Sequence, residues 1–225
     1  MPHNVEVPDY VIERIMAKRG KLHVFDKFDP TKTALIVIDM QNFFVAEVET
    51  AISICPNINR LADVVRGKGG VVAWVQLTVA DEMDGPSLWP IYHDYFFTPE
   101  KMKAHKDGLT KGSEGHALFS DLVVKDEDII ALKNRFSSFI QGSSDLHDRL
   151  QEKDIENLLV AGTATNFCCE TSARDAMMIG YRTVMVSDAN AARYDEDHLA
   201  GLTTIWQSFG DVRTVDECIN TLLAE

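Results

Sequence analysis

The chain has little of what marks secreted, membrane-bound or metal-binding proteins. Its four cysteines, at 55, 168, 169 and 218, show no spacing typical of a metal site, and they favour a reduced, cytoplasmic setting. The longest apolar runs, such as 33–40, are far shorter than the roughly 20 residues that span a bilayer. No basic segment followed by an apolar one marks a secretory signal. We therefore expect no membrane association and no export.

Positive charge is also scarce. Lysine and arginine total 22 against 35 aspartates and glutamates, which gives a net charge of -13. Such a protein repels phosphate backbones, so nucleic acid is not an expected partner. Hydrophobic residues make up 45% of the 225 residues, which suits a globular protein with a sizeable core. We expect one α/β domain over 1–225.

Short apolar runs alternate with helical stretches from residue 33 onward. The runs are continuous, which is typical of parallel strands covered on both faces. The pattern therefore predicts a three-layer α-β-α fold around a doubly wound, six-stranded, mainly parallel sheet. Strands are expected over 34–38, 70–77, 128–132, 157–161, 182–187 and near 212–215, and helices over 57–66, 143–152, 167–179, 196–207 and 216–223.

Two segments fall outside this alternation. The first, 1–30, contains a predicted helix from Pro8 to Arg19, and we expect it to form an arm packed on the domain or on another subunit. The second, 78–127, is a long insert with few strand signals and many aromatic residues. A segment of this length inside a compact domain is usually functional, so it is expected to cover a pocket or to contact a neighbouring subunit.

Three reactive side chains follow predicted strands. Asp39 follows the first strand, Lys133 follows the third, and Cys168 begins the helix after the fourth. Because active sites of doubly wound sheets lie at the carboxyl ends of the strands, all three are expected at one edge. The helix N-terminus and Lys133 would lower the pKa of the Cys168 thiol, and Asp39 would accept its proton and pass it to a leaving nitrogen. Taken singly, each has an ordinary explanation: Asp39 as a turn or helix cap, Lys133 as a solvated lysine, and Cys168 as an inert thiol of the core.

The segments around these residues resemble a known family. ALIVIDMQN from residue 34, KNRFSSF from residue 133 and VAGTATNFCCETSARDA from residue 160 are similar to the isochorismatase-like cysteine hydrolases. Within that family the chain most resembles the ureidoacrylate and N-carbamoyl amidohydrolase branch. The resemblance implies the triad Asp39, Lys133 and Cys168, a cis peptide bond at Thr163–Ala164, and an oxyanion hole formed by the N–H groups of Ala164 and Cys168.

The same resemblance implies an activity. A small amide or ureide would be cleaved at its C–N bond through a thioester, with release of ammonia; isochorismatase-type or other small-amide hydrolysis is the alternative. Nicotinamidases of the family hold a metal with an Asp and His cluster after the second strand, but 75–81 contains no histidine here, so we expect no metal and no other cofactor. We also expect a homo-oligomer, a dimer or tetramer.

Four residues near strand ends are candidates for the substrate pocket: Phe44, Gln76, Arg135 and Ser138. Each is as easily explained by ordinary packing. Arg135 is a possible partner for a substrate carboxylate.

Two less favoured functions remain open. Cys168 to Arg174 fits the Cys-x5-Arg loop of cysteine phosphatases, although the loop has no glycine and Glu170 would repel phosphate. The second less favoured function is that of a non-catalytic, oligomeric member of the family.

Overall fold

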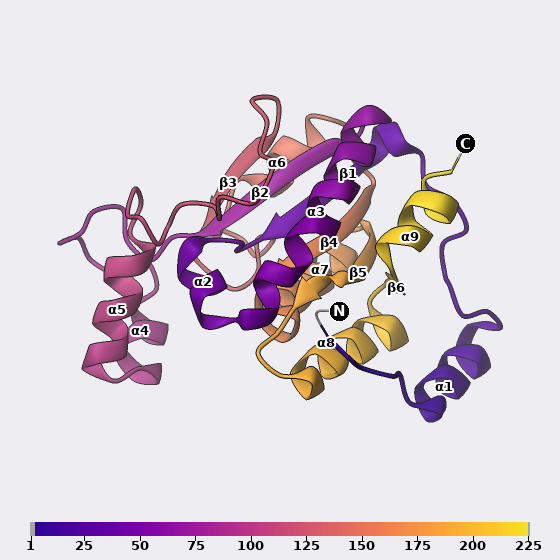
Figure 1. Ribbon diagram of the computed structural model, residues 1–225, viewed down its shortest axis with the longest axis horizontal. Coiled ribbons are helices and arrows are strands. Elements are labelled where there is room, and N and C mark those ends of the chain that lie inside the picture. The colour runs from indigo at the N-terminus through magenta and orange to yellow at the C-terminus, as the bar shows by residue number, and fades with distance from the viewer. Residues whose placement is uncertain (1–2, 225) are drawn as a thin grey trace.

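The computed structural model describes residues 3–224, and its centre is a single six-stranded sheet (Figure 1). Neighbouring strands lie in the order β3-β2-β1-β4-β5-β6, and every pairing is parallel. The doubly wound fold predicted from the sequence is therefore confirmed, with a sheet that is parallel throughout. Chain order reverses between β1 and β4, which makes their carboxyl ends the topological switch point where such folds bind ligands. The strands are β1 Thr33–Ile38, β2 Val71–Leu77, β3 Ile129–Lys133, β4 Asn157–Thr163, β5 Arg182–Ala191 and β6 Asp211–Arg213.

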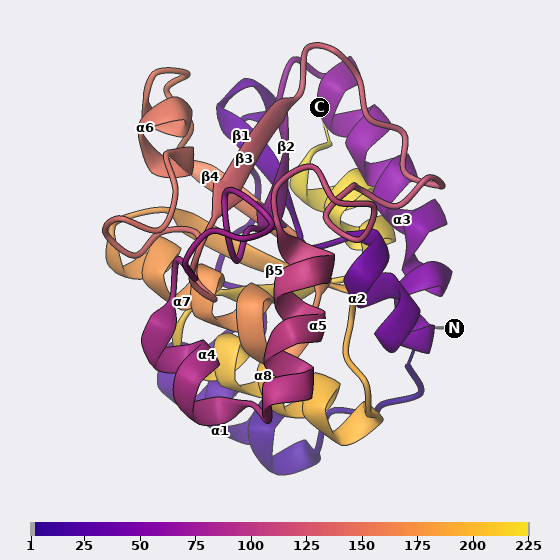
Figure 2. The same ribbon diagram turned by 90° about the vertical axis from the view of Figure 1, so that its left-hand side faces the viewer.

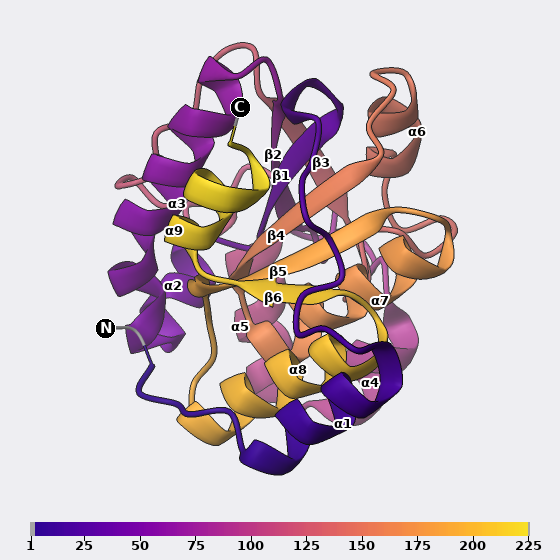
Figure 3. The same ribbon diagram turned by 90° about the vertical axis from the view of Figure 1, so that its right-hand side faces the viewer.

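Helices cover both faces of the sheet, so it forms the middle of three layers (Figure 3). On β1, Leu35 and Val37 pack toward α3 and the C-terminal helical turns, whereas Ile36 and Ile38 pack toward α1, α6, α7 and α8. Burial on both faces is the reason that the strands read as continuous apolar runs. The helical elements of these layers are α1 Asp9–Arg19, η1 Pro30–Lys32, α2 Asn42–Glu47, α3 Glu49–Gly67, α6 Leu146–Gln151, η2 Thr165–Cys169, α7 Glu170–Met178, α8 Asp195–Ser208, α9 Val215–Glu217 and η3 Cys218–Leu222.

Two helices differ most from the sequence-based boundaries. The helix expected from residue 57 begins at Glu49 and contains Pro56 in its interior. The buried Ile54 and Cys55 hold its first half against the core. Conversely, the helix expected over 143–152 is confined to Leu146–Gln151. Within 3–224, no helix combines the length and the apolar character needed to cross a bilayer.

The insert 78–127 is folded rather than irregular. It contains α4 Pro90–Phe96 and α5 Pro99–Leu109, which project from the body at the left of Figure 1 and face the viewer in Figure 2. The Val79 N–H donates to the carbonyl of Leu109 at 3.0 Å, which closes the base of this hairpin. The side-chain amide of Gln41 joins the insert to the end of β2 by donating to the carbonyls of Leu77 and His116, at 3.1 and 2.9 Å.

The N-terminal arm packs on its own domain. Val11 and Ile15 of α1 are fully buried, and they belong to the core cluster that also contains Leu202 and Ile205 of α8. Gly20 ends the helix in the left-handed conformation, as its place after Arg19 predicts.

Candidate active site

The strand ends bring Asp39, Lys133 and Cys168 into contact. The Lys133 ammonium Nζ lies 2.8 Å from Asp39 Oδ2 and 3.3 Å from Cys168 Sγ. It also donates to the carbonyl of Arg135 at 3.0 Å. All three side chains are buried, with at most 5% of each residue exposed. The fold thus assembles a carboxylate, an ammonium and a thiol from three separate strand ends.

The backbone at the switch point is shaped for this contact. Asp39 has φ 52°, a left-handed conformation that is uncommon for a residue with a side chain and that clusters at functional sites. Beside it, Gly162 has φ 116°, and a Cβ there would lie 2.1 Å from the Ile38 carbonyl oxygen. Only glycine therefore lets β4 approach the end of β1 this closely. The next peptide bond, Thr163–Ala164, is cis, as the family resemblance implies.

Burial and mutual charge set the protonation of the triad. Burial raises the pKa of the Asp39 carboxyl, against the opposing effect of Lys133. For Lys133 burial acts in the other direction, but the charges of Asp39 and Cys168 outweigh it and raise the pKa of the ammonium. Burial and then the Asp39 carboxylate raise the pKa of the Cys168 thiol, and Lys133 only partly opposes them. The expectation of a lowered thiol pKa is therefore replaced by a resting state with a neutral thiol.

This arrangement allows a proton to move without changing the net charge of the buried site. At rest, the Asp39 carboxylate balances the Lys133 ammonium, and the Cys168 thiol is neutral. If the thiol proton passes to Asp39, the thiolate balances Lys133 instead. Since the summed charge is zero in both states, neither places an uncompensated charge in the interior, which would be costly.

A cavity of about 350 Å³ lies above the triad and exposes Asp39 and Cys168 to a ligand. Its volume suits a small molecule. Ala164, the second proposed oxyanion donor, also lines it. Helices α4 and α5 of the insert form part of the wall, so the insert covers a pocket, one of the two roles expected of it. The aromatic lining residues are Phe44, Tyr92, Phe97, Phe136, Phe167 and Tyr194.

Of the four residues predicted for the pocket, Phe44 lines this cavity and the other three are placed elsewhere. The Gln76 amide donates to the carbonyl of His116 at 2.7 Å. The Arg135 guanidinium donates to the carbonyl of Leu88 at 2.9 Å and lies over the ring of Trp89. The backbone N–H of Ser138 donates to the hydroxyl of Ser172 at 3.1 Å.

Sequence reasoning missed the polar lining residues. Lys101 and His105 come from α5, Thr163 ends β4, and Arg193 and Asp197 follow β5. The density of aromatic residues in 78–127 was the only signal that pointed to this region.

The N-terminal segment reaches the wall formed by residues 193–197. The ring of His3 accepts a hydrogen bond from the Ala192 N–H through Nε2, at 3.0 Å, and therefore donates through Nδ1 to Asp195, at 2.7 Å. It also stacks on His198 with ring centroids 4.0 Å apart. His198 in turn contacts the hydroxyl of Thr165, which begins the turn that carries Cys168, at 2.8 Å.

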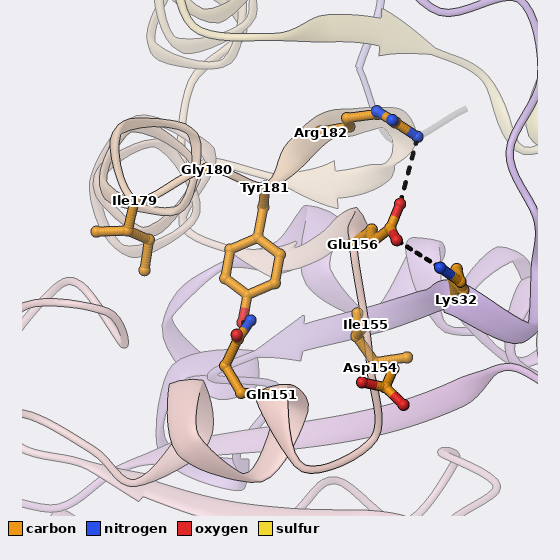
Figure 4. Close-up of a pocket in the computed structure, with 9 residues that line it drawn as sticks. All are labelled: Lys32, Gln151, Asp154, Ile155, Glu156, Ile179, Gly180, Tyr181 and Arg182. Carbon is orange, nitrogen blue, oxygen red and sulfur yellow. Dashed lines mark hydrogen bonds and ion pairs between the residues drawn. The ribbon is translucent and has the colours of Figure 1, made fainter.

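A second hollow, of about 650 Å³, lies at the opposite, amino-terminal edge of the sheet (Figure 4). Its lining carries two cations, Lys32 and Arg182, and two anions, Asp154 and Glu156. Glu156 pairs with Lys32 at 2.5 Å and with Arg182 at 3.7 Å. None of its described lining residues is a cysteine or serine. Despite its size, this hollow offers no arrangement comparable to the triad.

The loop of a cysteine phosphatase is not formed at this site. The guanidinium of Arg174 pairs with Glu170 and lies over the ring of Phe209, with 4.6 Å from Cζ to the ring centroid. Its guanidinium is thus paired on the surface of α7 and is not positioned to bind a phosphate.

Among residues 3–224, no three histidine, cysteine, aspartate or glutamate side chains are grouped so as to hold a metal ion.

Comparison with known proteins identifies the family. The model of the isochorismatase domain matches residues 33–217, which is most of the chain. The chain belongs to the isochorismatase family. A protein of Arabidopsis thaliana named probable inactive nicotinamidase is 33% identical over 177 residues, covering 76% of this chain and 86% of the relative.

Solved structures of isochorismatase-like proteins share the fold. A cysteine hydrolase from Pseudomonas syringae pv. phaseolicola 1448A is 28% identical, with a TM-score of 0.75 over 87% of this chain and 95% of that one. A nicotinamidase from Bacillus subtilis is 26% identical, with a TM-score of 0.65 over 81% of this chain and 99% of that one.

Proposed function

We propose that this isochorismatase-family protein is a cysteine hydrolase that cleaves the C–N bond of a small amide or ureide. The observation that carries the proposal is the contact of Lys133 with both Asp39 and Cys168 at the floor of a small cavity. A buried thiol next to a carboxylate and an ammonium has both the nucleophile and the proton carrier that acyl transfer requires. The cysteine hydrolase and nicotinamidase relatives support this chemistry.

In the proposed reaction, Cys168 attacks the carbonyl carbon while its proton passes to Asp39. The N–H groups of Ala164 and Cys168 stabilise the resulting oxyanion, and Lys133 stays next to the sulfur. When the C–N bond breaks, the nitrogen takes the proton from Asp39 and leaves as ammonia or an amine. Asp39 then takes a proton from water as that water attacks the thioester carbonyl. When the C–S bond breaks, the sulfur takes this proton back from Asp39, and the acid product leaves with the thiol restored.

The proposed substrates are N-carbamoyl acids, ureidoacrylates and biuret- or guanylurea-like compounds, as the sequence resemblance implies. A panel of ureides and amides, including N-carbamoylglycine, biuret and nicotinamide, should be screened for ammonia release with wild type and Cys168→Ala. We expect release by wild type alone, together with a covalent acyl adduct on Cys168 in mass spectra of quenched reactions. Equal release by Cys168→Ala would show that the thiol is not the nucleophile, and no release from any compound would favour the non-catalytic alternative.

We also propose that the protein acts as a homo-oligomer. Three large side chains of α4 are strongly exposed, with 66% of Ile91, 81% of Tyr95 and 73% of Phe96 accessible. Apolar residues grouped in this way often mark an interaction surface. Mass photometry should give a dimer or tetramer for wild type and a shift toward monomer for Tyr95→Lys combined with Phe96→Lys.

A further inference from the structure

Buried polar atoms that lack a hydrogen-bond partner gather around the catalytic cavity. Among the described residues they are one atom each of His105, Thr163 and Asn190, together with Oδ1 of Asp39, whose Oδ2 pairs with Lys133; His105, Thr163 and Asp39 line the cavity. Buried polar groups in native proteins are normally paired, so a group of unpaired ones calls for a partner. A polar ligand in the cavity supplies that partner.

The reacting amide accounts for only some of these atoms. Thr163 ends β4 and Asp39 follows β1, so both stand at the strand ends with Cys168, where an amide carbonyl and its nitrogen must lie during attack. His105 comes from α5 in the insert, and its Nδ1 is buried and unpaired among the described residues. A second polar group on the ligand would supply its partner.

The face of α5 that lines the cavity indicates the charge of that group. Lys101, Ala104 and His105 all line it, and their spacing of three and four residues places them on one side of the helix. Ala104 is small, which leaves room between the two larger side chains. Burial, aided by the charges of His93 and Lys101, lowers the pKa of His105 to about 4. At neutral pH this face thus offers an ammonium and an uncharged imidazole able to donate a hydrogen bond.

We propose that Lys101 and His105 form a subsite for a carboxylate of the substrate, so that the preferred substrate is an amide or ureide that is also an acid. The proposal rests on the hydrolase function above, which fixes where the reacting carbonyl lies. Arg193 adds a second cation to the same cavity, while Asp197 adds an anion on α8. The carboxylate is therefore assigned to α5, whose lining side chains carry positive charge and no negative charge.

Two alkylating reagents test the charge preference without any turnover. Iodoacetate and iodoacetamide differ only in a carboxylate against an amide, and each forms an S–C bond with Cys168 as iodide leaves. We expect Lys101→Met to lower the rate of labelling by iodoacetate relative to that by iodoacetamide. The ratio of the two rates should fall by up to about fivefold, which is the effect of one partly exposed ion pair. The matched control is Lys103→Met, because Lys103 lies on the same helix, is exposed and pairs with Asp107.

The outcomes separate this inference from the proposed function. An unchanged ratio in Lys101→Met, with Cys168 still labelled, would overturn the carboxylate subsite and leave the hydrolase intact. Failure of both reagents to label Cys168 in wild type would contradict the nucleophile itself, and the subsite with it.

A matched pair of substrates tests the same subsite during catalysis. N-carbamoylglycine and N-carbamoylglycinamide differ only in the acid group. Wild type should favour the acid through a lower KM, and Lys101→Met and His105→Phe should each raise that KM several-fold with little effect on kcat. His105→Phe keeps an aromatic ring against Phe43 and Phe97, so its packing is largely retained. An equal preference for the acid in these variants and in wild type would overturn the proposal.

Discussion

Replacing Asp39 by asparagine should separate the reactivity of the Cys168 thiol from turnover. The substitution keeps the size of the side chain and removes the negative charge that, after burial, does most to raise the pKa of the thiol. Without that charge, the Lys133 ammonium has no buried carboxylate to balance it. The Cys168 thiolate is the remaining anion within reach, so its formation becomes easier.

The two distances give Lys133 similar attractions to the Asp39 carboxylate and to a Cys168 thiolate. At 2.8 Å, the attraction between Lys133 and the Asp39 carboxylate is about 6 kcal/mol for an effective dielectric constant of about 20. At 3.3 Å, the attraction between Lys133 and a Cys168 thiolate is about 5 kcal/mol on the same basis. Because the two values are similar, the thiolate is nearly as good a counter-charge as the carboxylate.

Turnover by Asp39→Asn should nevertheless fall by about 10²–10⁴-fold, since the leaving nitrogen loses its proton donor.

The assay is the pH dependence of iodoacetamide labelling at Cys168, read by mass spectrometry, beside kcat for the best amide. We expect the labelling curve of Asp39→Asn to move to lower pH and that of Lys133→Met to move to higher pH. Asp197→Asn, which removes a charge from the cavity wall, should shift the curve far less. A curve for Asp39→Asn at higher pH would refute the assigned charges, and full turnover by this variant would remove Asp39 from the proton path.

Four further outcomes follow from the site and its supports. Cys168→Ser should abolish turnover without unfolding the protein, whereas Cys169→Ala should keep most of it, because Cys169 is fully buried and contacts a β4 carbonyl; the reverse result would exchange their roles. Activity should survive dialysis against EDTA, and a loss restored only by zinc, iron or manganese would contradict this. Burial and the neighbouring His3 lower the pKa of His198 to about 3. As the pH falls, the unfolded chain therefore binds a proton at this histidine before the folded protein does, and the free energy of unfolding should fall by roughly 2–4 kcal/mol between pH 6.5 and 3. Chemical denaturation should show that the stability of His198→Gln depends less on pH over this range. His3→Ala should raise KM more than it lowers kcat, because the cavity wall at Asp195 loses its hydrogen bond to His3 while the strands that carry the triad are unchanged. An unchanged KM would show that the N-terminal arm does not shape the cavity.

The sequence predicts the floor of the site because that floor depends on local rules. Continuous apolar runs identify buried parallel strands, and a parallel sheet brings the ends of all its strands to one edge. Asp39 and Lys133 follow such runs directly, so their meeting can be inferred without a structure. The thiol pKa could not be inferred, because it depends on how completely Cys168 is buried and on its position relative to Asp39.

The walls of the cavity depend on contacts that are remote in sequence. Arg135 has the right chemistry for a substrate carboxylate and stands two residues from Lys133, yet its guanidinium is held by Leu88 and Trp89 of the insert. Lys101 and His105 lie about thirty residues earlier, and nothing in their spacing shows that α5 turns back over the strand ends. Residues of this kind are placed by the tertiary packing of the insert, which hydrophobic periodicity does not encode.

Catalysis and substrate choice therefore have different origins in this chain. The triad stands on strands that every doubly wound sheet of this order would bring together, and Gly162 allows their close approach. The surfaces that a substrate meets beyond the reacting bond come from α4, α5 and the turn after β5, and that turn is held by His3, which precedes the matched domain at 33–217. A relative can share the strands and the chemistry while differing in every one of these surfaces. For this reason the resemblance can suggest the class of amide or ureide, but the choice within that class must be inferred from Lys101, His105 and their neighbours.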